Sequence, residues 1–356
     1  MKIWLDLRFI TDDLYSSFVI ELVKWIIGQN KNYEFIIYSN KNLEWFNFKN
    51  CSIKNVKIKN NSFKEQTTYN KILKKDNNAL MIFFNHYKPV FYKWEYYTLV
   101  ASLKDIYYND FSNYFHKYFF LFLLEKNLKN SRKIICFDKN TSDELVEKFN
   151  IKEEKINLIN WFFPNKETLT NIEDLKIDIK IKYDLKNPFY IYSWGEWLEK
   201  NYEKLVSVFK KLKNEWVEID LVLLWKNITK NIPLRKLILE NNMQKNIHFV
   251  SIIKQNEKIL FYKNALWVIF PSFYEPFPFR LTEPLYYKTP ILASDLKNIK
   301  KVFNDKIKYF SPISVNSIYE TVKNDILNPR KTTDYNQINI DFSKEKTIAQ
   351  LLDIIN

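Results

Sequence analysis

The chain has 356 residues, of which 46% are hydrophobic and 27% charged, so it is long enough to build two domains with sizeable cores. This composition excludes a disordered chain, and no run of about 18 apolar residues predicts a membrane-spanning helix. Two cysteines and three histidines far apart in the sequence exclude a disulfide framework and argue against a metal site. The net charge is +14, but the lysines are spread over every segment, which indicates a solvated surface rather than a nucleic-acid site.

Strands alternate with amphipathic helices in the first half of the chain, which is typical of a parallel sheet covered by helices. The polar stretch 165–188 then predicts a linker. The elements predicted before this linker are strand 2–7, helix 15–28, strand 34–38, strands 80–84 and 97–103, helix 111–128, strand 133–137 and helix 141–149.

The same alternation restarts after the linker, which predicts an α/β fold of two Rossmann-like domains with parallel sheets facing across a cleft. We assign residues 1–175 to the N-terminal domain and 176–356 to the C-terminal domain, with a final helix at about 343–355 packing near the cleft. The elements predicted in the second half are strand 189–193, helix 202–214, strand 220–224, helix 234–241, strand 247–250, helix 254–262, strand 266–270, helix 283–287 and strand 290–293.

The predicted helix 111–128 is aromatic over most of its surface and has two interpretations. A helix buried between other elements would have this pattern, and so would a helix that lies on a membrane surface with help from the basic composition. We favour the buried helix, with the membrane surface as the alternative.

Two glutamates follow the predicted strand 266–270, with seven residues between them. Glu275 lies on the loop and Glu283 at the start of the next helix, where free backbone N–H groups favour phosphate oxygens. Ionised carboxylates accept strong hydrogen bonds from sugar and ribose hydroxyls. The spacing by itself is equally typical of an exposed loop acid followed by a helix N-terminal charge.

The surrounding string, residues 268–295, resembles the Glu-x7-Glu motif of retaining glycosyltransferases of the GT-B fold, of the family 4 type, also called glycosyl transferases group 1. The resemblance includes the Phe-Pro-Ser strand before the motif and the Thr-Pro-Ile-Leu-Ala-Ser strand after it. It extends over nearly the whole chain, because four further segments resemble family elements: 134–145, 155–161, 191–201 and 341–352.

The resemblance implies roles for particular residues. Glu275 would contact the donor sugar, and Lys200 would neutralise the diphosphate leaving group, so these two are the implied catalytic residues. The donor site would further contain Glu283 on the nucleotide ribose, Trp194, Gly195, Asn201, Phe277, Phe279, Arg280, Leu281 and Thr282. The acceptor side would contain Lys104, Asp105, Asp12 and Asp13.

The sequence departs from the family pattern in several places. Pro276 and Pro278 replace residues that would supply backbone N–H groups, and Gly195 stands where many relatives have a phosphate-binding arginine. Arg280 would add positive charge in compensation, although an ordinary surface arginine is the alternative. On the acceptor side, Lys104 replaces the usual histidine before aspartate, and the loop 11–16 lacks the usual glycines.

The chain contains only 2 glycines, where average usage would give about 25, and it contains 10 tryptophans. Tryptophan occupies four positions that the family fills with glycine: Trp4, Trp161, Trp194 and Trp225. We hypothesise that the gene uses a code in which one stop codon means glycine, and that this sequence reads that codon as tryptophan. The alternative is genuine tryptophans that form an aromatic core and donor-stacking platforms.

The predicted function is a metal-independent retaining transfer of a sugar from a nucleotide diphosphate sugar, the co-substrate, to a saccharide or lipid-linked saccharide, with no further cofactor. The alternative is a non-catalytic sugar- or nucleotide-binding protein of the same fold. We exclude an epimerase or a phosphorylase of similar fold, because the sequence has neither the catalytic acid pattern of the first nor the cofactor-binding lysine context of the second. The absence of a basic and apolar leader favours a cytoplasmic protein of polysaccharide biosynthesis, with peripheral contact at the inner face of the membrane as a further alternative.

Overall fold

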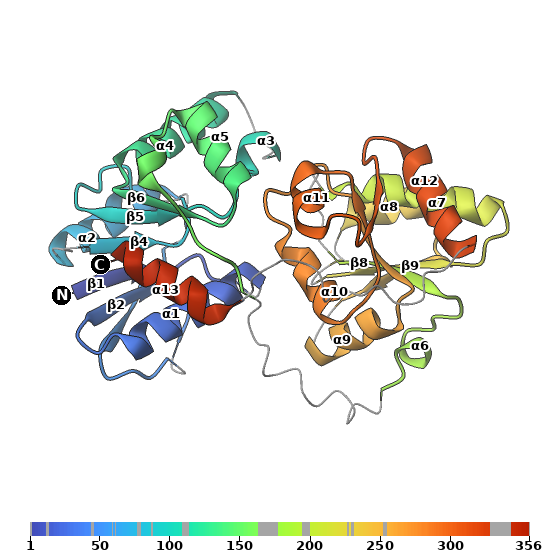
Figure 1. Ribbon diagram of the computed structural model, residues 1–356, viewed down its shortest axis with the longest axis horizontal. Coiled ribbons are helices and arrows are strands. Elements are labelled where there is room, and N and C mark those ends of the chain that lie inside the picture. The colour runs from blue at the N-terminus through green and yellow to red at the C-terminus, as the bar shows by residue number, and fades with distance from the viewer. Residues whose placement is uncertain are drawn as a thin grey trace. The chain divides into compact units, whose positions relative to one another are not determined.

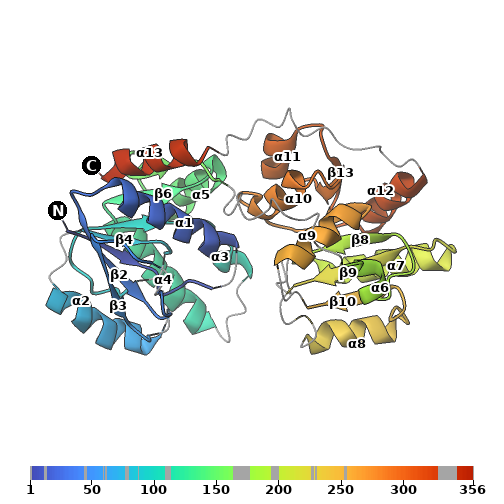
Figure 2. The same ribbon diagram turned by 90° about the horizontal axis from the view of Figure 1, so that it is seen from below.

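The computed structural model divides into two compact units, each a parallel sheet covered by helices (Figures 1 and 2). The first unit comprises Met1–Pro164 with Asp341–Asn356, and the second Asn165–Ile340. Two parallel-sheet α/β domains are the fold class that the sequence predicts. The structure describes residues 2–11, 14–43, 46–58, 60, 62–76, 80–86, 88–108, 114–162, 177–193, 200–225, 228, 231–251, 255–327 and 343–355, without the side chains of 105, 108, 114–116, 255 and 256.

The first sheet is entirely parallel and has the strand order β3-β2-β1-β4-β5-β6-β7. Its inner strands are buried on both faces, which explains their continuous apolar sequences. The two edge strands were not predicted, because they lack such runs: β3 is largely exposed and β7 is partly exposed. The strands are β1 (Lys2–Asp6), β2 (Glu34–Ser39), β3 (Cys51–Asn55), β4 (Leu80–Phe83), β5 (Tyr96–Leu99), β6 (Lys133–Cys136) and β7 (Ile156–Leu158).

The helices of the first unit include a π-helical turn, η1, that runs directly into α2. Helix α5 begins two residues before its predicted start, because the Asp138 side chain caps it by accepting a hydrogen bond from the Thr141 backbone N–H at 2.9 Å. The helical elements are α1 (Leu14–Gln29), η1 (Glu65–Tyr69), α2 (Asn70–Asp76), α3 (Asp105–Tyr108), α4 (Tyr114–Asn130), α5 (Lys139–Phe149), η2 (Glu153–Lys155) and α13 (Lys344–Ile355).

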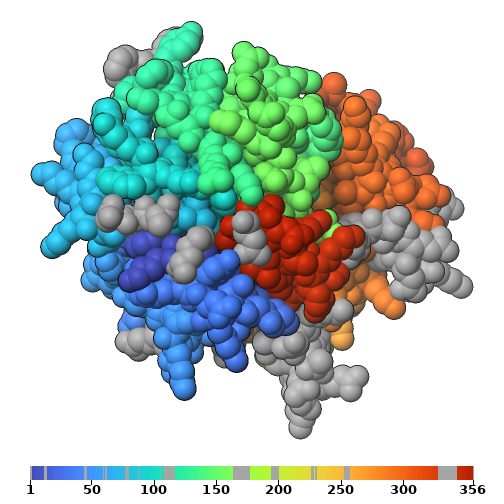
Figure 3. All heavy atoms as spheres, turned by 60° about the vertical axis from the view of Figure 1, so that its left-hand side comes forward, coloured from blue at the N-terminus to red at the C-terminus, as the bar shows by residue number. Residues whose placement is uncertain are grey.

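The C-terminal helix α13 belongs to the first unit, whereas the sequence-based boundaries assign it to the second domain. It packs beside α1, and in Figure 3 it lies against blue and green residues of the first unit. The side-chain oxygen of Gln350 accepts a hydrogen bond from the Asn160 backbone N–H at 2.8 Å, and Lys133 donates to the Ile354 carbonyl at 2.5 Å. The sequence could not reveal this return of the chain, because it depends on contacts between residues about 200 positions apart.

Helix α4 is buried along only one side, so our preference for a helix buried between other elements is wrong. Leu124 and Leu128 lie in a core cluster with residues of β6 and α5. Tyr118, Phe119 and Phe122 are instead 69%, 52% and 58% exposed. In the part of the chain that the structure describes, no helix is long and apolar enough to cross a bilayer.

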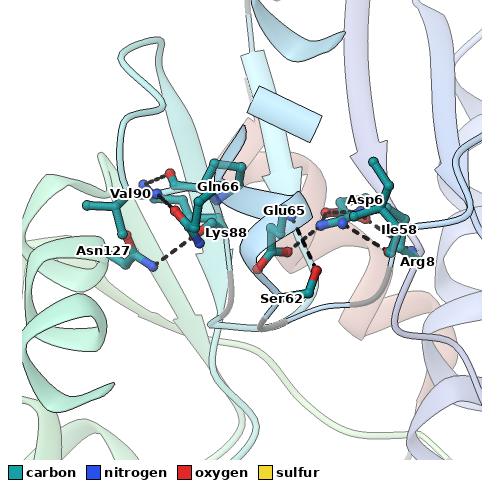
Figure 4. Close-up of polar contacts among 10 residues, drawn as sticks. Asp6, Arg8, Ile58, Ser62, Glu65, Gln66, Lys88, Val90 and Asn127 are labelled. Carbon is teal, nitrogen blue, oxygen red and sulfur yellow. Dashed lines mark hydrogen bonds and ion pairs between the residues drawn. The ribbon is translucent and has the colours of Figure 1, made fainter. Parts of the chain in front are cut away.

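A buried ionic cluster follows strand β1 (Figure 4). The Arg8 guanidinium donates to both carboxylate oxygens of Asp6, to Glu65 at 2.7 Å and to the Ile58 carbonyl at 3.3 Å. It also lies 3.5 Å from the centre of the Tyr69 ring. Burial by itself would lower the pKa of Arg8, but the neighbouring Asp6, Tyr69 and Glu65 outweigh burial and raise it. The cluster therefore joins the end of β1 to η1 through the Arg8 guanidinium.

The second sheet is also entirely parallel, with the strand order β10-β9-β8-β11-β12-β13. Figure 1 shows α7 and α12 on one side of this sheet and α6 and α9 on the other. The strands are β8 (Phe189–Tyr192), β9 (Asp220–Leu224), β10 (Ile247–Val250), β11 (Trp267–Phe270), β12 (Ile291–Ser294) and β13 (Lys308–Phe310). The helical elements are α6 (Ile179–Lys182), α7 (Tyr202–Asn214), α8 (Ile232–Glu240), α9 (Gln255–Asn264), η6 (Phe279–Leu281), α10 (Thr282–Tyr286), α11 (Lys297–Phe303) and α12 (Val315–Leu327).

The tryptophans at positions that the family fills with glycine lie in different environments. Trp4 and Trp161 are buried, and Trp161 stacks on Phe18 with ring centroids 4.1 Å apart, as expected for genuine core tryptophans. Trp4 nevertheless has a buried indole N–H without an acceptor among the described residues. Trp225 packs edge-on against Tyr192, and Trp194 lies outside the described residues.

Trp216, at the end of helix α7, has the backbone conformation that glycine favours. Its φ is 60°, and its N–H donates to the Lys213 carbonyl while the Val217 N–H donates to the Leu212 carbonyl. This hydrogen-bond pattern is the helix-ending motif in which glycine, or less often asparagine, occupies the left-handed position. The indole is 92% exposed, so burial of the ring does not compensate for the strain. Trp216 therefore extends the glycine hypothesis to a position that the sequence comparison did not single out.

We expect Trp216→Gly to stabilise the protein by about 1 kcal/mol, because a left-handed conformation costs roughly 1–2 kcal/mol for a residue with a Cβ atom. Urea unfolding measures this difference, and Trp216→Ala is the matched control because it removes the indole but keeps the Cβ atom. An equal gain in both variants would assign the effect to the exposed ring instead. For the natural protein, mass spectrometry of the peptides that contain positions 161 and 216 distinguishes glycine from tryptophan directly.

Candidate functional site

The candidate site lies at the carboxyl ends of β8 and β11 in the second unit. These two strands are neighbours, and the strand order of the sheet reverses direction between them. In open parallel α/β sheets, ligands bind beside the carboxyl ends of the strands at such a reversal. Lys200 lies on the segment after β8, and Glu275 lies on the loop after β11. The fold therefore brings together two predicted site residues that are 75 positions apart in the sequence.

Lys200 and Glu275 form a buried ion pair. The Nζ atom of Lys200 lies 2.8 Å from Oε2 of Glu275, and their side chains are only 5% and 9% exposed. The Asn298 side chain donates to the Glu275 backbone carbonyl at 2.9 Å, which holds the loop in place. A buried charge is costly unless it is paired, so this contact offsets part of the cost of burying the two groups. The structure thus provides an ammonium and a carboxylate at one edge of the sheet.

Asn201 holds three segments of the unit together. Its backbone has φ of 56°, a left-handed conformation that asparagine tolerates better than most residues. Its side-chain amide donates to the Pro271 carbonyl at 2.9 Å and to the Pro312 carbonyl at 2.8 Å. Asn201 is buried and directly follows Lys200, so these bonds fix the backbone from which the lysine side chain extends.

Glu283 is the second residue of α10 and is held by side chains from helix α9. Its Oε2 atom contacts Nζ of Lys258 and accepts a hydrogen bond from the Tyr262 hydroxyl at 3.0 Å. Burial and then the nearby Glu283 charge raise the pKa of Tyr262 well above its usual value, so this hydroxyl remains a donor. Glu283 is 4% exposed. Sequence reasoning missed Lys258 and Tyr262, because nothing in their spacing to Glu283 indicates contact.

The loop between the two glutamates uses its backbone donors internally. The N–H of Phe279 donates to the Phe277 carbonyl at 2.8 Å, and the N–H of Leu281 donates to the Pro278 carbonyl at 3.0 Å. The Thr282 hydroxyl donates to the Phe279 carbonyl at 2.5 Å. The resemblance implies that this backbone approaches phosphate groups, but these N–H groups already have acceptors. The Phe279 and Leu281 N–H groups are therefore engaged within the loop, and Lys200 and the half-buried Arg280 are its basic side-chain candidates for a phosphate.

Several predicted site residues are placed elsewhere or cannot be placed. Lys104 and Asp105 follow β5 in the first unit, where Lys104 directly precedes α3 and its backbone N–H donates to the Ser102 hydroxyl at 3.1 Å. The Asp105 side chain lies outside the described set. Among the described residues, no group of three or more acidic, histidine or cysteine side chains is arranged to hold a metal ion. Four predicted site residues lie outside the described residues, namely Asp12, Asp13, Trp194 and Gly195.

The two parallel-sheet units define the chain as a protein of the GT-B glycosyltransferase fold, a class in which two Rossmann-like domains are joined in one chain. Residues 176–337 match the family model of glycosyl transferases group 1. The match covers most of the second unit, which carries Lys200, Glu275 and Glu283, so that unit is similar to members of that glycosyltransferase family.

Individual known proteins are also similar to this chain. The O-antigen chain mannosyltransferase RfbU of Salmonella typhimurium is 21% identical over 226 residues, which are 63% of this chain and 59% of that protein. Sucrose-phosphate synthase from Thermosynechococcus elongatus has a TM-score of 0.71 and 13% identity, and the match covers 100% of this chain and 98% of that one. HepE of Anabaena in complex with UDP-glucose has a TM-score of 0.72 and 11% identity, with the same coverage. At these identities, the structural matches establish the fold.

Proposed function

We propose that this protein transfers a sugar from a nucleotide diphosphate sugar to a saccharide or lipid-linked saccharide, with retention of configuration at the anomeric carbon. The observation that carries the proposal is the buried Lys200–Glu275 pair at the strand-order reversal, followed by Glu283 on the next helix. The group 1 family match over this unit supports the same reaction class.

Each of the three side chains has a proposed role in this reaction. The Lys200 ammonium neutralises the charge that develops on the diphosphate as the bond to the sugar breaks, and a compact point charge needs no bidentate geometry for this. Glu275 contacts the donor sugar, and Glu283 accepts hydrogen bonds from the ribose hydroxyls. Because Lys200 already contacts Glu275, the diphosphate would add to this pair or replace the carboxylate as the partner of the ammonium. The proposal requires no metal and no cofactor besides the sugar donor.

The substrate class is proposed from the relatives. RfbU is named as an O-antigen chain mannosyltransferase, and another protein of similar fold, WaaG, is described as a glycosyltransferase of lipopolysaccharide biosynthesis. HepE is described in complex with UDP-glucose. We therefore propose a cytoplasmic role in polysaccharide biosynthesis, with a nucleotide sugar as donor and a growing saccharide as acceptor.

Thermal protection by UDP, GDP and ADP tests the donor site. One nucleotide at 100 times its Kd should stabilise the protein by about 2.7 kcal/mol, which raises Tm by several degrees. Glu283→Gln should abolish this rise, because the neutral amide accepts weaker hydrogen bonds from ribose. Glu275→Gln should retain most of the rise but lose turnover. The exposed Glu218→Gln is the matched control and should behave as the parent.

Two outcomes would contradict the proposal. If Glu283→Gln is protected as well as the parent, the assigned ribose site is wrong. If nucleotide binds but no activated sugar releases nucleotide in the presence of saccharide acceptors, the non-catalytic binding protein is the better description.

The same panel applied to a variant with glycine at 4, 161, 194 and 225 tests the glycine hypothesis, which expects tighter nucleotide binding than in the tryptophan-containing chain.

A further inference from the structure

Helix α9 carries two adjacent charged residues, Glu257 and Lys258, that contact different elements of the second unit. Glu257 is buried, and its carboxylate contacts Nζ of Lys182 and accepts a hydrogen bond from the Tyr183 hydroxyl at 2.8 Å. Lys182 ends α6 and Tyr183 follows it, so Glu257 anchors the first turn of α9 to that short helix. Lys258, the next residue, contacts Oε2 of Glu283 on α10. The contact with α6 therefore fixes the part of α9 from which Lys258 extends.

Tyr262 lies one helical turn after Lys258 on the same face of α9, and its hydroxyl donates to the same oxygen of Glu283 at 3.0 Å. The Tyr262 ring stacks on Tyr287 with centroids 5.7 Å apart, and its backbone carbonyl accepts a hydrogen bond from the Thr289 hydroxyl at 3.0 Å. Nζ of Lys258 lies 5.7 Å from the Tyr262 ring centre. One face of α9 thus supplies two donors to Glu283 and is itself bonded to the segment that follows α10.

The helix that carries Glu283 is too short to fix the carboxylate by itself. Helix α10 has five residues, and Glu283 is the second of them. A glutamate side chain has several rotatable bonds, and their freedom is lost only where neighbouring groups hold the carboxylate. The side chains of Lys258 and Glu283 are 20% and 6% exposed, so solvent screens this pair less than a surface pair. A group that binds a ligand through directed hydrogen bonds gains affinity when its neighbours fix it before the ligand arrives.

We propose that Lys258 is a positioning residue of the donor site, which holds the Glu283 carboxylate, together with Tyr262, in the orientation that accepts hydrogen bonds from the ribose hydroxyls. The inference rests on the proposed ribose role of Glu283 and adds a residue that does not itself touch the nucleotide. It gives different tasks to the two lysine–glutamate pairs of this unit. Lys200 acts on the leaving group directly, whereas Lys258 acts only through its glutamate.

The experiment compares UDP with 2′,3′-dideoxy-UDP, which lacks the ribose hydroxyls, by calorimetric titration of the full chain. Where GDP or ADP protects the parent better than UDP, that nucleotide and its dideoxy form are used. The parent should bind the ribose form about 10- to 100-fold more tightly, because the dideoxy form loses hydrogen bonds to a charged acceptor. Lys258→Met should lower the affinity for the ribose form about tenfold and leave the affinity for the dideoxy form unchanged.

Three further variants separate positioning from a general structural effect. Lys258→Arg keeps the cation and should retain most of the ratio between the two affinities, whereas the exposed Lys263→Met on the same helix is the matched control and should behave as the parent. The double variant Lys258→Met, Glu283→Gln should have the same ratio as Glu283→Gln alone, because the lysine has no effect without the carboxylate. If Lys258→Met does not fold, Lys258→Gln replaces it with the same expected ratio.

The outcomes distinguish this inference from the proposed function. A ratio that falls in Lys258→Met, persists in Lys263→Met and is equal in the double variant and Glu283→Gln supports the inference. Equal loss of affinity for both nucleotides overturns it, because Lys258 would then contact another part of the nucleotide or only support the fold. A ratio that persists in Lys258→Met but falls in Glu283→Gln overturns the positioning role and leaves the proposed function intact. A ratio that persists in Glu283→Gln, or a parent that binds both nucleotides equally, removes the ribose assignment and the inference with it.

Discussion

Lys200→Met is expected to lower kcat about 100- to 1,000-fold for the proposed sugar transfer. The substitution keeps the length of the side chain and removes its charge, so the leaving diphosphate loses the ammonium that neutralises it. The effect should fall on kcat more than on KM, because the charge on the leaving group increases as the bond breaks. Steady-state release of nucleotide from an activated sugar measures both constants.

Two controls distinguish this chemical role from a structural one. Lys200→Met leaves Glu275 buried without its partner at 2.8 Å, so the double variant with Glu275→Gln should recover stability but not turnover. Lys200→Arg keeps the charge and should recover part of kcat. A single variant that folds normally and turns over like the parent would remove Lys200 from the mechanism.

Arg8→Met is expected to destabilise the protein by about 3–5 kcal/mol, because it leaves two buried carboxylates without a counter-charge. The side chains of Arg8, Asp6 and Glu65 are 0%, 2% and 1% exposed, so water cannot replace the lost guanidinium. The Arg8 side chain also links the end of β1 to η1, so its loss should weaken the packing between these two elements. Urea unfolding of the full chain measures the change in free energy.

Arg132→Met is the matched control for this prediction. Arg132 pairs with Glu95, but their side chains are 60% and 37% exposed, so this change should destabilise the protein far less than Arg8→Met. Similar losses in the two variants would show that burial does not set the strength of the Arg8 cluster. A loss below about 1 kcal/mol for Arg8→Met would contradict the prediction that the buried carboxylates depend on Arg8.

The buried elements of the second unit could be predicted closely from the sequence. Helix α7 and strands β9 and β10 have the predicted bounds, because their apolar periodicity ends at clear polar residues. Several elements that escaped prediction are short or exposed, whereas the unpredicted helix α12 has 13 residues and a buried face. Strand β3, for example, is almost entirely exposed and has the composition of a loop.

The candidate site was predicted only in part. The string around Glu275 and Glu283 carries a recognisable motif, but only the structure shows that Lys200 contacts Glu275. The contact of Lys258 and Tyr262 with Glu283 had no sequence signal, because helix α9 approaches from a separate part of the chain. The internal use of the Phe279 and Leu281 N–H groups likewise depends on the local path of the loop.

The sequence by itself determined the alternation of strands and helices, the two-domain α/β class and the family motif, because these depend on local periodicity and on short strings of residues. Only the tertiary structure decided that α13 returns to the first unit, that α4 exposes Tyr118 and Phe122, and that Arg8 is enclosed by Asp6 and Glu65. The physical reason is that burial and charge pairing are properties of surfaces brought together from distant positions. An aromatic or charged residue has the same letter in the sequence whether its neighbours in space are water, a core or an opposite charge.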